Sequence, residues 1–535
     1  MNNQQISDAL FELAELSKAA GENRFKSSAY RKAAVAVKEF EGRVEDLEDP
    51  TVLSGIGSGI AKKIKQLVKT GAIAKATELK EETGASELLE VPGIGPKTAK
   101  KLKEDLGVTT IDQLKKAVEE GKVNEHIATG LKAYEATDRE RKRLDEAIAV
   151  ANPIVFILSK KFPNAQFEAC GSLRRLKETI GDIDVLCACN GERDDVLREF
   201  SNLMETILVS GDTKISGVKN GLQVDLRVVQ REQFGAAILY FTGSQEFNVY
   251  MRNIAISKGM KLNEYGLYKD ETRIAGETEE DIFEALGLSF VPPILRETTY
   301  YLDHSEEMEN IVTEEDILGD FHVHTTWSDG DLRIIDLAEI ADLKGYKFLG
   351  IADHSEKMSF ANGVTNKESE EIVQEIRDLN THHDVRILAS REVEILKDGE
   401  LDLPSNVDEL DYIVASLHYR QKDNTGAILK AVQHPKVKVL AHPTARLVNQ
   451  REPMEADWDE VFKACAEHGV ALEINGNTYR LDLNPDMARR AKHFGCKFAL
   501  STDTHAMGGM GDIRFALAIA QKAGLTPEDF WNPED

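Results

Sequence analysis

The sequence has few cysteines and no long apolar run. Five cysteines occur in 535 residues and none of them forms a CxxC pair, which argues against a disulfide framework or a cysteine zinc site. No stretch approaches twenty consecutive apolar residues, so we expect no membrane span. The first twenty residues lack the basic start and the apolar core of a secretion signal. These absences predict a cytoplasmic protein with reduced cysteines.

Positive charge is also scarce. The chain has 66 Lys and Arg residues against 93 Asp and Glu residues, which gives a formal net charge of −27. A protein of that charge repels a polyanion such as DNA on average. Lysines are nevertheless dense in residues 62–65 and 97–103. Local charge, rather than the total, therefore decides whether nucleic acid can bind.

A glycine-rich segment occurs twice in the first 150 residues, which otherwise read as short helices. The sequences LSGIGSGIAKKI (residues 53–64) and VPGIGPKTAKKL (residues 91–102) each place paired glycines in a turn before a lysine-bearing helix. Such a turn lets the backbone approach a phosphate and points N–H groups at it. The repeat resembles helix-hairpin-helix motifs, which hold DNA backbones without reading sequence. A dinucleotide-binding loop and a plain helix corner are the alternatives. The predicted DNA contacts are Gly55, Gly57, Gly93 and Gly95.

Acidic side chains mark two expected strands after residue 150, where the sequence changes to mixed helix and strand. Asp182 and Asp184 are two positions apart in one strand and therefore point to the same face. Two carboxylates held that close repel each other unless a divalent cation lies between them. Asp225, from a second strand, would complete a cluster able to hold two ions for in-line nucleotidyl transfer. The alternative is an acidic edge of a solvated sheet.

Motifs on either side of these strands narrow the interpretation. Gly171-Ser172 precedes the acidic pair, and the sequence YFTGS at residues 240–244 follows Asp225. With the helical N-terminus, these motifs resemble the family X DNA polymerases of the DNA polymerase beta type, over roughly residues 1–293. The resemblance implies that the three carboxylates carry catalytic Mg²⁺ and that Arg252 contacts the template strand. The residues it implies for the incoming nucleotide are Ser172, Arg175, Tyr240, Phe241, Gly243 and Asn248.

The sequence departs from this family at two places. Gln223 stands where vertebrate members often have arginine, so support of the primer terminus differs here. Lys63 matches the family's Schiff-base lysine, with Tyr30 and Lys26 as its neighbours, and is the predicted catalytic residue of a lyase. Gly59, however, replaces the lysine expected to bind a 5′-phosphate. A lysine that only contacts phosphate is the alternative role for Lys63.

Histidine is concentrated in the last third of the chain. Eleven of the thirteen histidines lie after residue 320, and several stand with acidic residues where short apolar strands end. We expect such strands at residues 348–352, 412–416, 437–441, 470–474 and 498–501. Mixed imidazole and carboxylate ligation favours Zn²⁺, Mn²⁺ or Fe²⁺ over Ca²⁺. The candidate ligands are His322, His324, Asp329, His354, Glu392, His418, His442, Asp503 and His505.

This series resembles the PHP (polymerase and histidinol phosphatase) domain over residues 318–535. The resemblance implies a distorted (β/α)7 barrel with a centre of three ions, Mn²⁺ or Zn²⁺, that cleaves phosphate esters. Arg446 and Arg480 are candidates for substrate phosphate contacts, with salt bridges as the alternative. Ser390 stands where the family commonly has glycine, but the ligand Glu392 is retained.

The order of these parts resembles that of the bacterial and archaeal PolX enzymes. It implies a monomeric DNA repair enzyme that acts on gapped or nicked duplex DNA and uses deoxynucleoside triphosphates. The barrel would add 3′→5′ exonuclease activity, with abasic-site endonuclease and 3′-phosphatase activities as further candidates. The alternative is a PHP nuclease or phosphatase whose polymerase half binds DNA but is inactive. The expected domains are a lyase-like helical domain (1–85), a fingers-like helix-hairpin-helix domain (86–150), an α+β nucleotidyltransferase palm (151–235), a thumb-like domain (236–295), a linker (296–317) and the PHP domain (318–535).

Overall fold

The computed structural model describes the chain except for residues 2, 21, 23, 39, 41, 84–86, 138–139, 359–360 and 535. The domain boundary expected between residues 85 and 86 lies outside the described residues. The chain forms two compact units. One contains residues 1–139, 204–211 and 215–223, and the other contains residues 140–203, 212–214 and 224–535.

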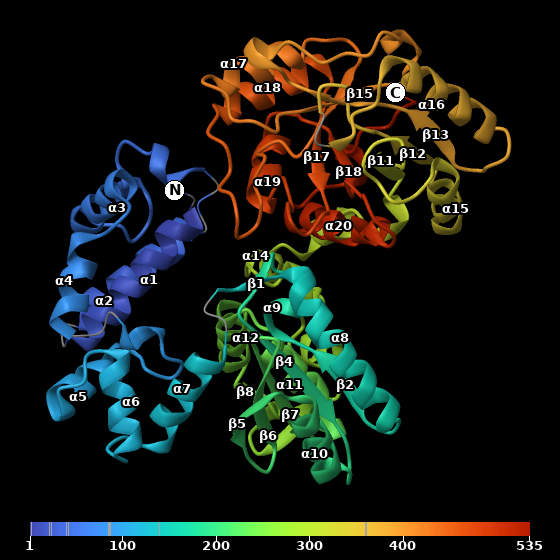
Figure 1. Ribbon diagram of the computed structural model, residues 1–535. Helices are drawn as coiled ribbons and strands as arrows, with labels where there is room; N and C mark the ends of the chain where they lie inside the picture. The colour runs from blue at the N-terminus through green and yellow to red at the C-terminus, as the bar shows by residue number, and fades with distance from the viewer. Residues whose placement is uncertain are drawn as a thin grey trace. The chain divides into compact units, whose positions relative to one another are not determined.

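The described residues of the first unit up to residue 137 form helices and the turns between them (Figure 1). In the two glycine turns, Gly55 and Gly93 adopt φ of 81° and 83°, a left-handed conformation that favours glycine. Gly57 and Gly95 directly precede the helices α3 and α5. Apolar residues every three to four positions bury one face of α3 and leave its lysines toward solvent. The helices are α1 (Asn3–Ala19), α2 (Arg24–Lys38), α3 (Ser58–Thr70), α4 (Ala74–Thr83), α5 (Pro96–Leu106), α6 (Ile111–Glu119) and α7 (Glu125–Ala136).

The expected palm contains a five-stranded sheet of order β2-β4-β7-β6-β5. Alternating burial along β7 gives the sheet one covered face and one exposed face. The two acidic strands of the sequence, β4 and β7, are neighbours. The elements of this region are β1 (Lys142–Arg143), α8 (Leu144–Lys161), β2 (Gln166–Ala169), α9 (Gly171–Arg174), β3 (Thr179–Ile180), β4 (Asp182–Ala188), α10 (Arg193–Leu203), β5 (Thr206–Ser210), β6 (Lys214–Lys219) and β7 (Leu222–Val229).

The expected thumb packs around an apolar cluster that includes Phe247, Met251 and Phe283. The segment expected to be a linker, residues 296–317, contributes Tyr301 and Leu302 to the same cluster. It contains a short helix and two 3-10 turns. The elements are α11 (Phe234–Thr242), α12 (Gln245–Ser257), β8 (Met260–Asn263), β9 (Gly266–Lys269), β10 (Thr272–Ala275), α13 (Glu279–Ala285) and α14 (Tyr300–Asp303).

The C-terminal region is a closed barrel of parallel strands surrounded by helices (Figure 1). Parallel bridges between Val323 and Thr504 and between His354 and Glu392 join its two sheets, β11-β12-β13 and β14-β15-β16-β17-β18. Ser390 and Arg391 separate β13 from β14, so these two segments occupy one of seven strand positions. The strands are β11 (Gly319–Val323), β12 (Phe348–Ile351), β13 (Arg386–Ala389), β14 (Glu392–Glu394), β15 (Ile413–Ser416), β16 (Val437–Leu440), β17 (Ala471–Asn475) and β18 (Phe498–Ser501). The helices are α15 (Ile334–Lys344), α16 (Asn366–Leu379), α17 (Asn424–Ala431), α18 (Trp458–His468), α19 (Pro485–His493) and α20 (Ile513–Lys522).

Continuous apolar sequence explains the barrel strands, because a strand buried on both faces has no polar side to alternate with. The five strands expected after residue 340 form within one residue of their expected bounds. Among the residues described, no helix combines the length and apolar character that a membrane span requires.

Candidate active sites

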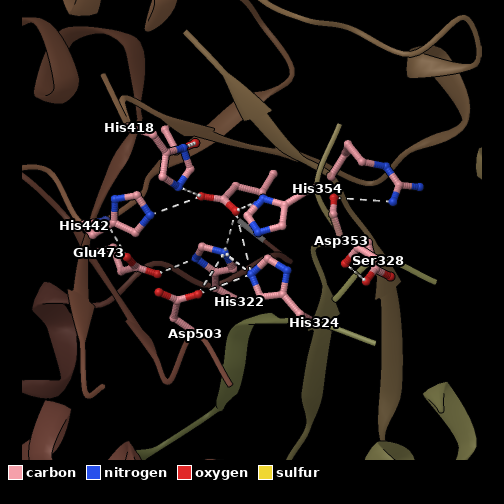
Figure 2. Close-up of polar contacts among 12 residues, drawn as sticks. His322, His324, Ser328, Asp353, His354, His418, His442, Glu473 and Asp503 are labelled. Carbon is pink, nitrogen blue, oxygen red and sulfur yellow. Dashed lines mark hydrogen bonds and ion pairs between the residues drawn. The ribbon is translucent and has the colours of Figure 1, made fainter. Parts of the chain in front are cut away.

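The barrel brings together all nine candidate metal ligands. They form three groups, each with possible ligand atoms within 4.8 Å of one another. In Figure 2 the imidazoles of His354, His418 and His442 point toward one centre. Glu392 lies between them: its carboxylate is 2.7 Å from His354 Nδ1, 3.4 Å from His418 Nε2 and 3.1 Å from His442 Nε2. The groups are His324, Asp329, His354 and His505; His322, His324 and Asp503; and Glu392, His418 and His442.

The position of each group follows from the strand order. In a barrel of parallel strands, the carboxyl ends meet at one end, where the active sites of such barrels lie. His324 follows β11, His354 follows β12, His418 follows β15 and His442 follows β16. His442 and Asp503 have φ of 26° and 52°, in a left-handed region that is costly for non-glycine residues. Strained residues of this kind cluster at functional sites.

Two buried glutamates that the sequence analysis did not select hold the histidine rings. His322 Nδ1 lies 2.7 Å from Glu473 Oε1, and His418 Nδ1 lies 2.6 Å from Glu394 Oε2. Each carboxylate accepts the proton on Nδ1, which leaves the Nε2 lone pair facing the cluster. A single acidic residue inside an apolar strand is the only signal that could have indicated Glu473.

The polar groups of this cluster fit divalent ions. His324 Nδ1 and His442 Nδ1 are buried and have no hydrogen-bond partner among the described residues. Burial lowers the pKa of His442 to about 4, with a further contribution from Arg480, so its ring is neutral at pH 7. Burial and neighbouring histidines likewise hold the pKa of His324 well below its usual range. Neutral imidazoles and an ionised carboxylate are the forms that bind a metal.

The two candidate phosphate-binding arginines have different surroundings. Arg446 donates to Glu178 Oε2 at 2.7 Å and to the Arg480 carbonyl at 2.9 Å, so it makes structural contacts. Arg480 Nε donates to Asp503 Oδ2 at 2.9 Å, beside the cluster. Arg480 Nη1 is buried with no hydrogen-bond partner among the described residues. Arg480 therefore retains a donor for a substrate oxygen.

The three palm carboxylates lie on the neighbouring strands β4 and β7. Burial and the charges of Asp182 and Asp225 raise the pKa of Asp184 to about 7. Burial and Asp225 also raise the pKa of Asp182. Lys214, which the sequence analysis did not select, pairs with Asp225 at 2.6 Å. Gly171 has φ of 64°, and a Cβ there would lie 2.9 Å from Asp184 Oδ2. The glycine therefore lets the Ser172 loop approach the carboxylates.

Three of the six predicted nucleotide-binding residues, Tyr240, Phe241 and Asn248, line two small pockets. One is lined by Asp184, Asp225 and Phe241, and the other by Tyr240, Asn248 and Arg252. Asn248 Nδ2 donates to the Tyr240 carbonyl at 2.6 Å, and Arg252 Nε donates to the Asn248 carbonyl at 3.2 Å.

The other three predicted residues, Ser172, Arg175 and Gly243, complete the nucleotide set. Arg175 Nε donates to Glu297 Oε1 at 2.6 Å. Its Nη1 donates to the carbonyl of Thr242 and lies 3.2 Å from where a Cβ of Gly243 would stand. Ser172 is half-buried in α9.

The predicted lyase residue lies on α3. Lys63 Nζ lies 5.9 Å from the centroid of the Tyr30 ring and donates to the Gly59 carbonyl at 3.4 Å. Tyr30 is one of the two neighbours that the sequence analysis named, and Gly59 is the position where the family's expected lysine is absent. The structure thus places Lys63 beside its expected aromatic neighbour.

Four family models match successive parts of the chain. They describe a helix-hairpin-helix domain (residues 1–73), the fingers domain of DNA polymerase lambda (86–137), a DNA polymerase beta thumb (237–297) and a PHP domain (320–477). DNA polymerase lambda of Rattus norvegicus is 29% identical over 55% of this chain and 56% of its own length. That of Arabidopsis thaliana is 25% identical over 54% of this chain and 61% of its own length.

Together, the modules and the two carboxylate-containing sites define a family X DNA polymerase core joined to a PHP domain. The protein named DNA polymerase/3′-5′ exonuclease PolX in Bacillus subtilis (strain 168) is 33% identical over 99% of this chain and 97% of its own length. The chain belongs to the PolX family.

Proposed function

We propose that this chain is a DNA polymerase that fills short gaps in damaged duplex DNA, and a 3′→5′ exonuclease that removes blocked 3′ ends. The observation that carries this proposal is the presence, in one PolX-family chain, of two separate acidic sites, each complete in its predicted residues. The two activities are complementary, because a polymerase cannot extend a 3′ end that lacks a free hydroxyl. The substrates are gapped or nicked DNA and deoxynucleoside triphosphates.

The polymerase site uses the carboxylates of Asp182, Asp184 and Asp225 to hold two Mg²⁺ ions. The raised pKa of Asp184 supports this role, because burial and then repulsion by Asp182 and Asp225 cause it, and cations between the carboxylates would offset both. When bound, such ions supply an activated 3′-oxygen and stabilise the leaving pyrophosphate. The side chains of this chain orient the nucleotide: Ser172 and Arg175 bind its phosphates, and Tyr240, Phe241, Gly243 and Asn248 its sugar and base.

The barrel site holds three ions, Mn²⁺ or Zn²⁺, through the nine clustered residues. When bound, these ions supply an attacking oxygen at neutral pH and neutralise the phosphate. Glu473 and Glu394 orient two of the histidine rings toward the ions. The free donor of Arg480 binds a non-bridging oxygen of the scissile phosphate.

The N-terminal unit binds the DNA backbone through its two glycine turns. Gly55 and Gly93 supply left-handed turns, and Gly57 and Gly95 lie at the starts of helices, where N–H groups attract phosphate. Arg252 contacts the template strand. Lys63 remains the predicted lyase nucleophile, and a monomer the predicted assembly.

A gel assay with three proteins tests the proposal. A 5′-labelled primer in a one-nucleotide gapped duplex is incubated with Mg²⁺ or Mn²⁺, with and without nucleotides. We expect primer extension to be lost only in Asp182→Ala and primer shortening to be lost only in His442→Ala, because the two sites share no residue. Shortening without extension under either metal would instead support a nuclease with an inactive polymerase half.

A further inference from the structure

The loop of residues 171–178 joins the predicted phosphate-binding residues to the carboxylate strand β4. Leu176, near its centre, has φ of 49°, a left-handed conformation that a branched apolar residue rarely adopts. Such a conformation persists only where the surrounding structure holds it. Leu176 directly follows Arg175, so its backbone sets where the Arg175 side chain begins, and Glu297 and the Thr242 carbonyl then hold the guanidinium.

A lysine from the C-terminal barrel binds the backbone of Leu176. Lys522, the last residue of α20, donates from Nζ to the Leu176 carbonyl at 2.6 Å. The amine also faces the carboxylates of Glu297 and Glu178 and the cations of Lys177 and Arg175. Burial lowers the pKa of Lys522 to about 8, so at pH 7 it stays mostly charged at a cost in solvation.

Further side chains of the barrel contact the end of this loop and the palm segment at β1. Arg446 donates to the Glu178 carboxylate at 2.7 Å, at the end of the loop. Asn449 Nδ2 donates to the Arg141 carbonyl at 2.5 Å, just before β1. The Arg143 guanidinium lies 3.7 Å from the centroid of the Tyr479 ring. The barrel therefore contacts the loop itself through Lys522 and Arg446, and the palm segment at β1 through Asn449 and Tyr479.

The charges around the loop favour a polyanionic ligand. Glu297 accepts from Arg175 at 2.6 Å and lies 3.6 Å from Lys177 Nζ. Lys522 is a third cation facing the same carboxylate. Lys522, Arg175 and Lys177 thus stand against two carboxylates, Glu297 and Glu178, which leaves one positive charge in excess beside the residues assigned to the triphosphate.

We propose that Lys522 of the barrel is a positioning residue of the polymerase, which holds the Leu176 carbonyl so that Arg175 is preset for the nucleotide triphosphate. The inference rests on the proposed polymerase function. It means that the PHP domain contributes to nucleotide binding independently of its own metal cluster, of which Lys522 is not a member.

The test measures binding of a complementary deoxynucleoside triphosphate to the full chain on a gapped duplex whose primer ends in a dideoxynucleotide. We expect Lys522→Met to weaken nucleotide binding about tenfold, because a charge-assisted hydrogen bond to the loop is lost. Lys522→Arg, which keeps a cationic donor, restores most of the affinity. With an extendable primer, the loss appears in KM for the nucleotide rather than in kcat. Exonuclease activity on a single-stranded oligonucleotide stays unchanged.

Lys492→Met is the matched control. Lys492 Nζ donates to the Gly524 carbonyl at 2.8 Å, a contact inside the barrel, so this variant should retain full nucleotide affinity. Glu178→Gln is a second test variant, which breaks the ion pair between Arg446 and the half-exposed Glu178. It should weaken nucleotide binding about threefold, as expected for a partly exposed ion pair.

Two results would overturn the inference. Nucleotide affinity unchanged in both Lys522→Met and Glu178→Gln would show that these contacts serve only the fold. An equal loss of affinity in Lys492→Met would show that any damage to the barrel has this effect. If the unsubstituted protein binds no nucleotide and extends no primer, the proposed polymerase function itself fails, and the inference with it.

Discussion

At the scale of single residues, the nine candidate metal ligands of the barrel are oriented by side chains that are not themselves ligands. Glu394 holds both the ring and the backbone of His418: its Oε2 lies 2.6 Å from Nδ1, and its Oε1 accepts from the His418 N–H at 3.2 Å. Glu473 holds the ring of His322 through Nδ1, and its other oxygen accepts from the backbone N–H of His442. Loss of such a supporting carboxylate typically lowers metal affinity or activity by about 10-fold to 100-fold.

We therefore expect Glu394→Gln to lower both metal content and exonuclease rate by about tenfold or more, with primer extension unchanged. Metal content is measured by elemental mass spectrometry after dialysis, and the exonuclease rate by shortening of a labelled oligonucleotide. Glu409→Gln, at an exposed position of the same barrel, is the control. Full metal content in Glu394→Gln would contradict a role in orienting His418.

The lowered pKa of Lys522 makes the free energy of unfolding depend on pH. Its pKa is about 8 in the folded chain and 10.5 in the unfolded chain. Between these values the unfolded chain binds more protons, so the free energy of unfolding rises with pH. The size of the pKa difference corresponds to about 3 kcal/mol. We expect the stability of the unsubstituted protein, relative to Lys522→Met, to increase by this amount from pH 8 to pH 10.5. Chemical unfolding at several pH values measures it, and a flat difference would contradict the lowered pKa.

At the scale of elements, the apolar pattern of the sequence predicted the positions of most barrel strands. It did not predict where a strand is interrupted. Strands such as β18 are short apolar runs, so their bounds follow from hydrophobicity alone. The break between β13 and β14 does not follow from hydrophobicity. Arg391 is buried there, and its Nη2 donates to Ser369 at 3.2 Å. A buried arginine is rare and depends on partners distant in the sequence.

The candidate sites likewise contain residues that the sequence predicted and residues that it did not. The spacing of residues such as Asp182 and Asp184 follows from strand geometry and predicts a shared face. Lys214, Glu394 and Glu473 could not be selected, because each is a single charged residue whose importance depends on the strand beside it. Sequence reasoning therefore identified the residues that face the ligands better than those that support them.

A buried charge cluster joins three elements of the palm and thumb. Glu279, at the start of α13, accepts from Arg174 of α9 at 2.8 Å and also from Arg296, whose side chain is fully buried. Arg174 Nη1 donates to Thr242 Oγ1 at 2.8 Å, at the end of α11. Burial alone would raise the pKa of Glu279, but the two arginines hold it below its usual value. The cluster thus fixes the turn that carries Gly243.

We expect Arg296→Met to lower the free energy of unfolding by about 3 kcal/mol, because it leaves a buried carboxylate with one partner fewer. Arg377→Met, which breaks an exposed pair with Glu409, should change it by less than about 1 kcal/mol. Denaturant unfolding of the two variants measures the difference. Equal effects would show that Arg296 contributes little beyond an ordinary surface pair.

At the scale of the whole molecule, a net charge of −27 has to coexist with DNA binding. The helices α3 and α5, which follow the glycine turns, supply local positive charge for DNA. Their exposed lysines include Lys62, Lys65, Lys97 and Lys101. Repulsion between exposed charges more than about 8 Å apart is screened at physiological salt, whereas direct phosphate contacts displace counterions from the DNA. Binding should therefore be governed by a few local contacts and should fall steeply as salt is added.

We expect Lys62→Ala combined with Lys97→Ala to weaken binding to gapped DNA uniformly across sequences. The slope of log affinity against log salt concentration should become shallower by about 2, since each phosphate contact contributes about 0.9. Fluorescence anisotropy over a salt series measures both quantities. Lys367→Ala combined with Lys430→Ala makes the same change in net charge on the barrel surface, so it separates local from global charge. A shift in slope only for the hairpin variant would establish that the glycine turns carry the phosphate contacts. Equal shifts in both variants would mean that net charge governs binding and that the hairpins do not hold the DNA backbone.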